Sequence, residues 1–191
     1  MIIFDLDGTL ADCEHRRHFI DPEKNPDYEF MQYQNIGNLL IKDEWWHRNE
    51  MVRGIPPSRK RWKPNWKAFF DACDQDKPID PSIITLRRHS QHEDIQIWSG
   101  RCESVREKTI AWFHHNVTGF APTYWFQKNL LMRPIGDSTP DDKLKEMWLE
   151  RHIAAGREPI EMVFDDRPKV VRMWRRRGVF VFDCNQLGKE F

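Results

Sequence analysis

The first twelve residues constrain the fold of this chain more than any other stretch. Met1–Phe4 is an apolar run typical of a strand buried on both faces of a sheet, and Asp5, Asp7 and Gly8 follow it. Residues two apart in an extended chain point the same way, so both carboxylates leave the strand on one face. Gly8 allows a sharp turn there. Two crowded carboxylates need a cation, a proton or a reaction, so this strand end is predicted to be a functional site.

Further along the chain, short apolar runs alternate with helical patterns. Four more strands are predicted, at Ile95–Trp98, Thr123–Gln127, Met162–Phe164 and Val179–Phe182. Helices are expected between them, near residues 81–92, 103–116, 140–155 and 168–177. This alternation predicts an α/β fold, with a doubly wound parallel sheet and helices on both faces. Ligands of such sheets bind at the carboxyl ends of the strands.

Residues 12–78 interrupt this alternation directly after the first strand. We therefore predict a core domain of residues 1–11 and 79–191, with residues 12–78 as a helical cap insertion. Short helices are expected at Glu14–Ile20 and Pro64–Cys73. A loop-rich insertion without a role at the site is the alternative.

The middle of the insertion is basic and rich in tryptophan. Between Lys42 and Lys67, eight Lys or Arg stand against three Asp or Glu, a net charge of +5, and four tryptophans are interleaved. This pattern favours a surface that stacks bases and binds phosphates of a single strand. Packing of the tryptophans inside the cap, with the charges facing water, is the open alternative.

Composition restricts the class of protein. With 191 residues, 39% hydrophobic and 31% charged, the chain is predicted to be a globular domain with an insertion. A formal net charge of zero argues against a uniformly basic nucleic-acid binder, although a local basic patch is compatible with it. Four scattered cysteines without C-x-x-C spacing indicate neither a zinc site nor a disulfide framework, so a cytoplasmic protein is expected. No apolar run approaches the ~20 residues that span a bilayer, so no membrane partner is expected.

Three further motifs fall at strand ends or helix starts of the predicted sheet. Ser99-Gly100-Arg101 follows the second strand, Lys143 and Lys145 lie on a later helix, and Asp165-Asp166 follow the fourth strand. We expect them near Asp5 and Asp7, because parallel strands end at one edge of the sheet. His15 and His18 have the spacing of a metal pair, but three-residue spacing on a short helix is common, and no ligand role is predicted.

In these motifs the sequence resembles the haloacid dehalogenase superfamily of aspartate-dependent phosphohydrolases. The resemblance covers residues 1–11 and 79–191. It implies Asp5 as the nucleophile that forms an aspartyl-phosphate, Asp7 as the general acid–base, and Ser99 with a lysine as phosphate contacts. The cofactor implied is Mg²⁺, with the ligands Asp5, Asp7 (through its backbone carbonyl), Asp165 and Asp166.

A finer resemblance is to the phosphatase domains of bacteriophage polynucleotide kinase–phosphatases, which remove 3′-phosphates from nucleic acid. It rests on Ser99-Gly100-Arg101, Gly136-Asp137, Asp165-Asp166-Arg167 and the run around Trp174. Its D-x-x-x-K spacing from Asp141 selects Lys145 over Lys143. The residues that it implies for substrate binding are Arg16, Gly100, Arg101, Arg133 and Asp141.

The predicted function is Mg²⁺-dependent hydrolysis of a phosphomonoester, with a phosphorylated nucleic-acid end as the partner. A nucleotidase acting on free nucleoside monophosphates is the alternative within the same chemistry. A receiver-like module that accepts a phosphoryl group, or a phosphate-binding protein on an inactive scaffold, is the alternative without an enzyme. No G-x-x-x-x-G-K-[ST] loop occurs, so no kinase half is expected in this polypeptide. The sequence leaves the oligomeric state open.

Overall fold

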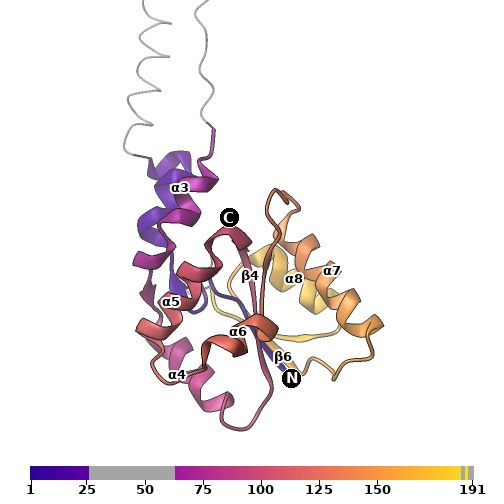
Figure 1. Cartoon of the computed structure of the whole chain (residues 1–191). Coiled ribbons are helices and arrows are strands. Elements are labelled where there is room, and N and C mark those ends of the chain that lie inside the picture. Colours follow the sequence, from indigo (N-terminus) through magenta and orange to yellow (C-terminus); the bar gives the residue numbers. More distant parts are fainter. Residues whose placement is uncertain (26–62, 186–187, 189–191) are drawn as a thin grey trace, which may run out of the picture. The chain divides into compact units, whose positions relative to one another are not determined.

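The computed structural model describes residues 1–25, 63–185 and 188 (Figure 1). The chain divides into two compact units, one formed by Met1–His15 with Phe70–Phe191 and the other by Arg16–Phe69. All site residues predicted from the sequence lie in the first unit, except Arg16. Most of the basic, tryptophan-rich stretch lies outside the described residues.

A five-stranded sheet forms the centre of the first unit, in the order β5-β4-β1-β6-β7. Every pairing is parallel. The strands are β1 (Ile2–Phe4), β4 (Ile95–Cys102), β5 (Leu130–Arg133), β6 (Met162–Asp165) and β7 (Phe180–Asp183). Ile2 pairs with Ile95 on one side and with Met162 on the other, so β1 is the central strand. The predicted doubly wound parallel sheet is confirmed.

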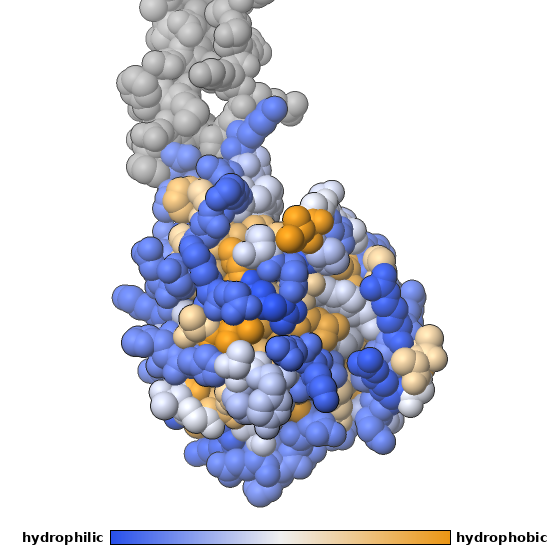
Figure 2. Space-filling view, in the orientation of Figure 1, coloured by the Kyte–Doolittle hydropathy of each residue, from blue (hydrophilic) through white to orange (hydrophobic). Residues whose placement is uncertain are grey.

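Alternate residues of β1 enter two separate hydrophobic cores. Ile2 and Phe4 pack in the core that includes α4, α5 and α6, whereas Ile3 packs in the core with α7 and α8. The helices on the first face are α4 (Asp80–His89), α5 (Arg106–Asn116) and α6 (Thr123–Asn129). Those on the second face are α7 (Asp141–Ala154) and α8 (Pro168–Arg176). Figure 1 shows the two helix groups on opposite sides of the strands, and hydrophilic side chains cover much of the face seen in Figure 2. Because β1 is covered on both faces, its apolar run follows from its position.

Short elements lie at the two ends of the insertion and around the sheet. They are β2 (Ala11–Asp12), η1 (Glu14–Phe19), η2 (Pro22–Lys24), α3 (Trp66–Asp71), η4 (Cys73–Gln75), β3 (Lys77–Pro78) and η5 (Glu103–Val105). β2 and β3 form an antiparallel pair, in which Ala11 lies opposite Pro78 and Asp12 opposite Lys77. The chain segments before and after the insertion are therefore joined by a small ladder.

One predicted strand and one predicted strand boundary are wrong. The strand expected at Thr123–Gln127 is the helix α6, and the strand of that region is β5, which begins at Leu130. The buried Phe126 packs against Phe113 of α5, so the aromatic run serves helix packing. The second strand also continues through Ser99-Gly100-Arg101 to Cys102, whereas the sequence placed this motif after the strand.

Within the described residues, no helix is long and apolar enough to cross a membrane. None of the four cysteines, which all lie in the described part of the chain, forms a disulfide bond.

Candidate active site

The end of β1 places Asp5 and Asp7 at the carboxyl edge of the sheet. Asp5 is buried, and its backbone N–H donates to the carbonyl of Phe164, 2.8 Å away, so the β1–β6 ladder continues to it. The chain then turns at Gly8, where φ is +88° and the N–H donates to the carbonyl of Ala11. A Cβ at Gly8 would collide with the carboxylate of Asp166. Glycine therefore allows both the turn and the close approach of Asp166.

Asp5, Asp165 and Asp166 form a buried cluster of carboxylates. One oxygen of each lies within 4.8 Å of the others, an arrangement that can hold a metal ion. The Lys145 Nζ donates to Asp5 Oδ1 at 2.6 Å and to Asp165 Oδ2 at 2.7 Å. One ammonium does not balance three carboxylates. Oxygen ligands and an excess of negative charge fit a hard divalent cation such as Mg²⁺.

Burial dominates the protonation of this cluster. Burial raises the pKa of Asp5 to about 6; Lys145 opposes this shift and Asp165 adds to it. Burial, followed by the charges of Asp5 and Asp165, raises the pKa of Asp166 well above its usual value. For Lys145, burial favours the neutral amine, but Asp165 and Asp5 outweigh it and raise the pKa. Lys145 is therefore a fixed positive charge, and a bound cation would favour the ionised forms of Asp5 and Asp166.

Ser99 and Gly100 lie on β4 beside the start of α7. Ser99 is fully buried, and its Oγ accepts from the backbone N–H of Arg101 at 3.2 Å. A Cβ at Gly100 would lie 2.8 Å from Asp141 Oδ1, so glycine here allows the close approach of α7. This contact brings the Ser99 motif next to the helix that carries Lys145.

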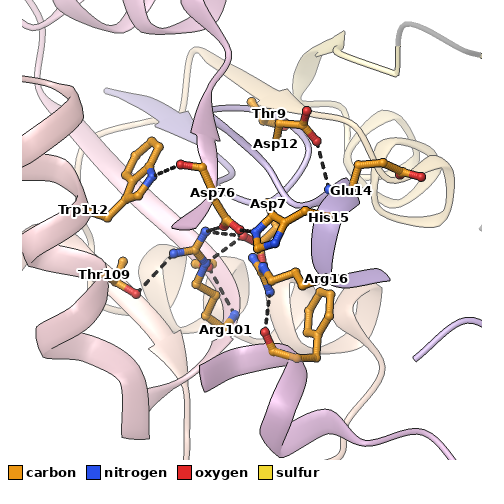
Figure 3. Close-up of polar contacts among 12 residues, drawn as sticks. Asp7, Thr9, Asp12, Glu14, His15, Arg16, Asp76, Arg101, Thr109 and Trp112 are labelled. Carbon is orange, nitrogen blue, oxygen red and sulfur yellow. Dashed lines mark hydrogen bonds and ion pairs between the residues drawn. The ribbon is translucent and has the colours of Figure 1, made fainter. Parts of the chain in front are cut away.

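Arg101 is fully buried between two carboxylates (Figure 3). Its Nε donates to Asp7 Oδ1 at 2.7 Å, and its Nη2 donates to Asp76 Oδ2. Burial would lower the pKa of Arg101, but the charges of Asp7 and Asp76 outweigh it and raise the pKa. The guanidinium thus holds the Asp7 side chain, and Asp7 is not a member of the carboxylate cluster that can hold a metal.

Asp141, at the first position of α7, accepts from two arginines. Arg133 Nη2 donates to its Oδ1, and Arg167 Nη1 pairs with its Oδ2. Arg133 also donates to the carbonyls of Gly100 at 3.0 Å and Thr139 at 2.5 Å. Burial lowers the pKa of Arg133, against the opposing charge of Asp137. Arg133 is therefore fixed at the edge of the site by backbone carbonyls as well as by Asp141.

Two residues considered in the sequence analysis, Arg16 and Lys143, have partners other than the carboxylate cluster. Arg16 belongs to the other unit, where its Nη1 donates to the carbonyl of Phe69 at 3.1 Å and its guanidinium lies 4.1 Å from that ring centroid. Lys143, the rejected alternative to Lys145, is exposed and pairs with Glu146 at 3.2 Å.

Comparison with known proteins places this chain in a family. A family model described as the polynucleotide kinase PNKP phosphatase domain matches residues 64–188, which are 125 of the 191 residues. The chain belongs to this family. Membership confirms the prediction of a haloacid dehalogenase-type phosphatase. β1 and the Asp7 turn lie before the matched residues.

Solved structures share the fold of this PNKP phosphatase domain. A chain of the Pnkp1/Rnl/Hen1 RNA repair complex is 23% identical with a TM-score of 0.56, and the match covers 95% of this chain and 41% of that one. A second structure of the Pnkp1/Rnl/Hen1 complex is 24% identical with a TM-score of 0.55, covering 96% and 45%. A putative phosphatase from Clostridium difficile is 13% identical with a TM-score of 0.53, covering 95% and 83%. This chain thus spans less than half of the two Pnkp1 chains. No curated protein sequence matches it at a significant level.

The structure of this PNKP phosphatase domain brings together most of the residues singled out from the sequence. Asp5, Lys145, Asp165 and Asp166 form one cluster, and Arg101 holds Asp7. Gly100, Arg133 and Asp141 lie together beside Ser99.

Sequence reasoning missed Asp76, and it quoted Arg167 in a motif and considered His15 without assigning either a role at the site. Arg167 directly follows the acidic pair, so its place beside the site could have been inferred. Asp76 lies in Cys73-Asp74-Gln75-Asp76, where nothing distinguishes it from the neighbouring Asp74. Only the fold shows that Asp76 is buried against Arg101.

Proposed function

We propose that this domain is a Mg²⁺-dependent phosphomonoester hydrolase that acts through an aspartyl-phosphate on Asp5 and removes 3′-phosphates from nucleic-acid ends. The observation that carries the proposal is that the two carboxylates have different partners. Asp5 lies in the buried cluster with Lys145, whereas Asp7 accepts from Arg101. Two acids that leave one strand in different environments can take different roles.

In the first step, a carboxylate oxygen of Asp5 attacks the phosphorus, and the bond to the leaving alkoxide breaks. Asp7 gives its proton to that alkoxide. In the second step, water attacks the phosphorus and gives a proton to Asp7, and the Asp5–phosphorus bond breaks to release inorganic phosphate. Lys145 and Ser99 are proposed to stabilise the phosphoryl oxygens.

Asp5, Asp165, Asp166 and the backbone carbonyl of Asp7 are the proposed ligands of Mg²⁺. When bound, the ion offsets the negative charge of the carboxylates and of the phosphate. Lys145 alone leaves the cluster negative, so it would repel a phosphate dianion without this ion.

Selectivity is proposed to come from groups outside this core chemistry. Of the arginines predicted to bind substrate, Arg101 already holds Asp7 and Asp76, so we assign it to positioning Asp7. Arg133 and Arg16 stay candidates for substrate contacts. The insertion, residues 12–78, is proposed as the cap, and its basic, tryptophan-rich sequence favours a nucleic-acid strand over a small phosphate ester.

A panel of substrates with and without Mg²⁺ tests the proposal. We expect phosphate release from a 3′-phosphorylated oligonucleotide to exceed release from the 5′-phosphorylated strand and from free nucleotides. Oligonucleotide turnover should weaken steeply with salt, because phosphate contacts release counterions, whereas p-nitrophenyl phosphate turnover should change far less. Replacing Arg59, Lys60 and Arg61 together should affect the oligonucleotide only. Equal efficiency on mononucleotides, without a salt slope, would favour a nucleotidase.

A further inference from the structure

Asp76 is a buried carboxylate for which the proposed reaction has no chemical step. Its side chain is fully buried, and each of its two carboxylate oxygens has a hydrogen-bond partner, His15 or Arg101. His15 Nε2 lies 2.9 Å from Oδ1, and Arg101 Nη2 donates to Oδ2 (Figure 3). An ionised carboxylate only accepts hydrogen bonds, so the imidazole nitrogen is the donor. The Asp76 carbonyl accepts from Trp112 Nε1 at 2.7 Å, which fixes its backbone as well.

One guanidinium is shared between two carboxylates at this point. The Nη2 of Arg101 lies 2.5 Å from Asp7 Oδ1 and also serves Asp76. A buried carboxylate is costly to leave without donors, so Asp76 competes with Asp7 for Arg101. The imidazole of His15 supplies one of the hydrogen-bond donors that the buried Asp76 carboxylate needs. Arg101 can therefore also donate to Asp7.

We propose that His15 is a positioning residue for Asp7, acting through Asp76 and Arg101. The inference rests on the proposed role of Asp7 as general acid–base. Without the imidazole, Asp76 Oδ1 loses a donor in a buried place and draws Arg101 away from Asp7. A misplacement of about 1 Å can reduce a rate by up to ~10²-fold. The His15 side chain is 38% exposed, so in its absence a water molecule can partly take over as hydrogen-bond donor to Asp76. We therefore expect kcat to fall by only about tenfold.

The same bond joins the two segments of the first unit that precede and follow the second unit, Arg16–Phe69. His15 is the last residue before that unit, and Asp76 lies six residues after the chain returns to the first unit at Phe70. The bond spans 61 positions of sequence, next to the β2–β3 ladder. The orientation of the Asp7 side chain is thereby connected to both segments of the first unit that flank Arg16–Phe69.

The experiment compares aryl phosphates whose leaving groups range from nitrophenol to phenol, with Mg²⁺ present. His15→Leu removes the donor and keeps the bulk, whereas His15→Gln keeps a donor. His114→Leu is the matched control, because His114 is an exposed histidine whose Nε2 hydrogen-bonds Thr123 and whose ring lies against Phe126, and neither residue belongs to the candidate site. Thermal unfolding of each variant shows that it is folded.

A general acid matters most for a poor leaving group, so we expect kcat of His15→Leu to fall about tenfold on phenyl phosphate and less than about threefold on p-nitrophenyl phosphate. His15→Gln should recover most of the loss, and His114→Leu should match the unaltered enzyme. Equal losses on all esters, no loss at all, or no recovery in His15→Gln would each overturn the inference.

A second readout keeps this test separate from the proposed reaction. The Nε–H resonance of Arg101 should be protected from exchange in the unaltered protein, and its exchange should accelerate in His15→Leu. If no aryl phosphate is hydrolysed by the unaltered protein, the proposed function fails and the role of His15 in catalysis fails with it. If turnover is present and the Arg101 signal does not change in His15→Leu, the proposed function stands and the role of His15 is wrong.

Discussion

Lys143 and Lys145 lie two positions apart on α7 and have opposite surroundings. Lys145 is buried between Asp5 and Asp165, whereas Lys143 is exposed beside Glu146. We expect Lys145→Met to reduce kcat by more than about 10²-fold, as for the loss of a preorganised charge, and Lys143→Met to stay within about twofold. Steady-state kinetics with p-nitrophenyl phosphate measure both. A severe loss in Lys143→Met with normal Lys145→Met would reverse the assignment.

Asp5→Asn separates chemistry from stability at one position. Turnover should fall to a trace, because an amide does not form the aspartyl-phosphate. Without Mg²⁺, the variant should unfold at a higher temperature, since burial disfavours the ionised form of Asp5; the gain should be about 1–3 kcal/mol. Calorimetry in a chelator measures this gain. Substantial turnover in Asp5→Asn would contradict the covalent mechanism.

Asp7→Asn tests the other acid. Because Arg101 would keep an amide oxygen as partner, the fold should be retained. The loss of kcat should be about 10²–10⁴-fold on a sugar phosphate and smaller on p-nitrophenyl phosphate, whose leaving group needs little protonation. If the losses on the two esters are equal, Asp7 does not act as the acid in the first step.

At the scale of elements, the turn after β1 depends on more than a backbone angle. Gly8 and Gly119 both have positive φ, +88° and +73°, but only at Gly8 would an added Cβ meet another side chain, that of Asp166. Gly119→Ala should cost about 1 kcal/mol from backbone strain alone. Gly8→Ala should cost at least about 2 kcal/mol more and should also reduce activity. Denaturant unfolding of the two variants measures the difference; similar values would mean that Asp166 moves aside freely.

The elements predicted correctly are those whose apolar pattern matches their burial. β1, β4 and β6 are covered on both faces of the sheet and read as apolar runs in the sequence. The failure at Thr123–Gln127 has a physical cause. Thr, Tyr, Trp and Phe favour strands, yet a short aromatic run fits a buried helix equally well. Packing of Phe126 on Phe113 and Phe120 stabilises the helix, and the strand begins only at Leu130.

For the candidate site, the positions of Asp5, Asp165 and Asp166 at strand ends predicted that they lie near one another at one edge of a parallel sheet, and the structure brings them together. Their role as a ligand set was implied by the family resemblance. The sequence did not predict the partners of Arg101. Arg101 lies on β4, and its partner Asp76, which directly follows η4, is 25 positions earlier in the sequence. His15 is 61 positions from Asp76. Such pairs depend on how η1 and η4 pack, and no local pattern records that.

At the scale of the whole molecule, pH and Mg²⁺ should act on stability together. The pKa of Asp5 and Asp166 is raised in the metal-free fold, so between about pH 4 and 6 the folded state binds more protons than the unfolded state. Stability from these groups therefore falls as pH rises through that range. If Mg²⁺ binds the carboxylate cluster as proposed, it displaces these protons, so the gain in Tm on adding Mg²⁺ should be larger at pH 7.5 than at pH 5.

Thermal scans in Mg²⁺ and in chelator at the two pH values measure this gain. At an ion concentration about 100 times Kd, the gain should correspond to about 2.7 kcal/mol. In Asp166→Asn, the gain in stability on adding Mg²⁺ should be much smaller. An equal increment at both pH values would mean that the ion does not bind at the carboxylate cluster.

The central position of β1 also has a consequence for biosynthesis. Its Ile2 pairs with Ile95 and Met162, which are 93 and 160 positions later in the chain. A ribosome therefore releases the strand that carries Asp5 and Asp7 long before either neighbour exists, and closing such long loops is slow. During that interval the apolar strand is unpaired and open to association with other nascent chains or to capture by a chaperone. Asp5 and Asp7 would therefore be translated well before the strands that pair with β1, and would reach their final places only after those strands exist.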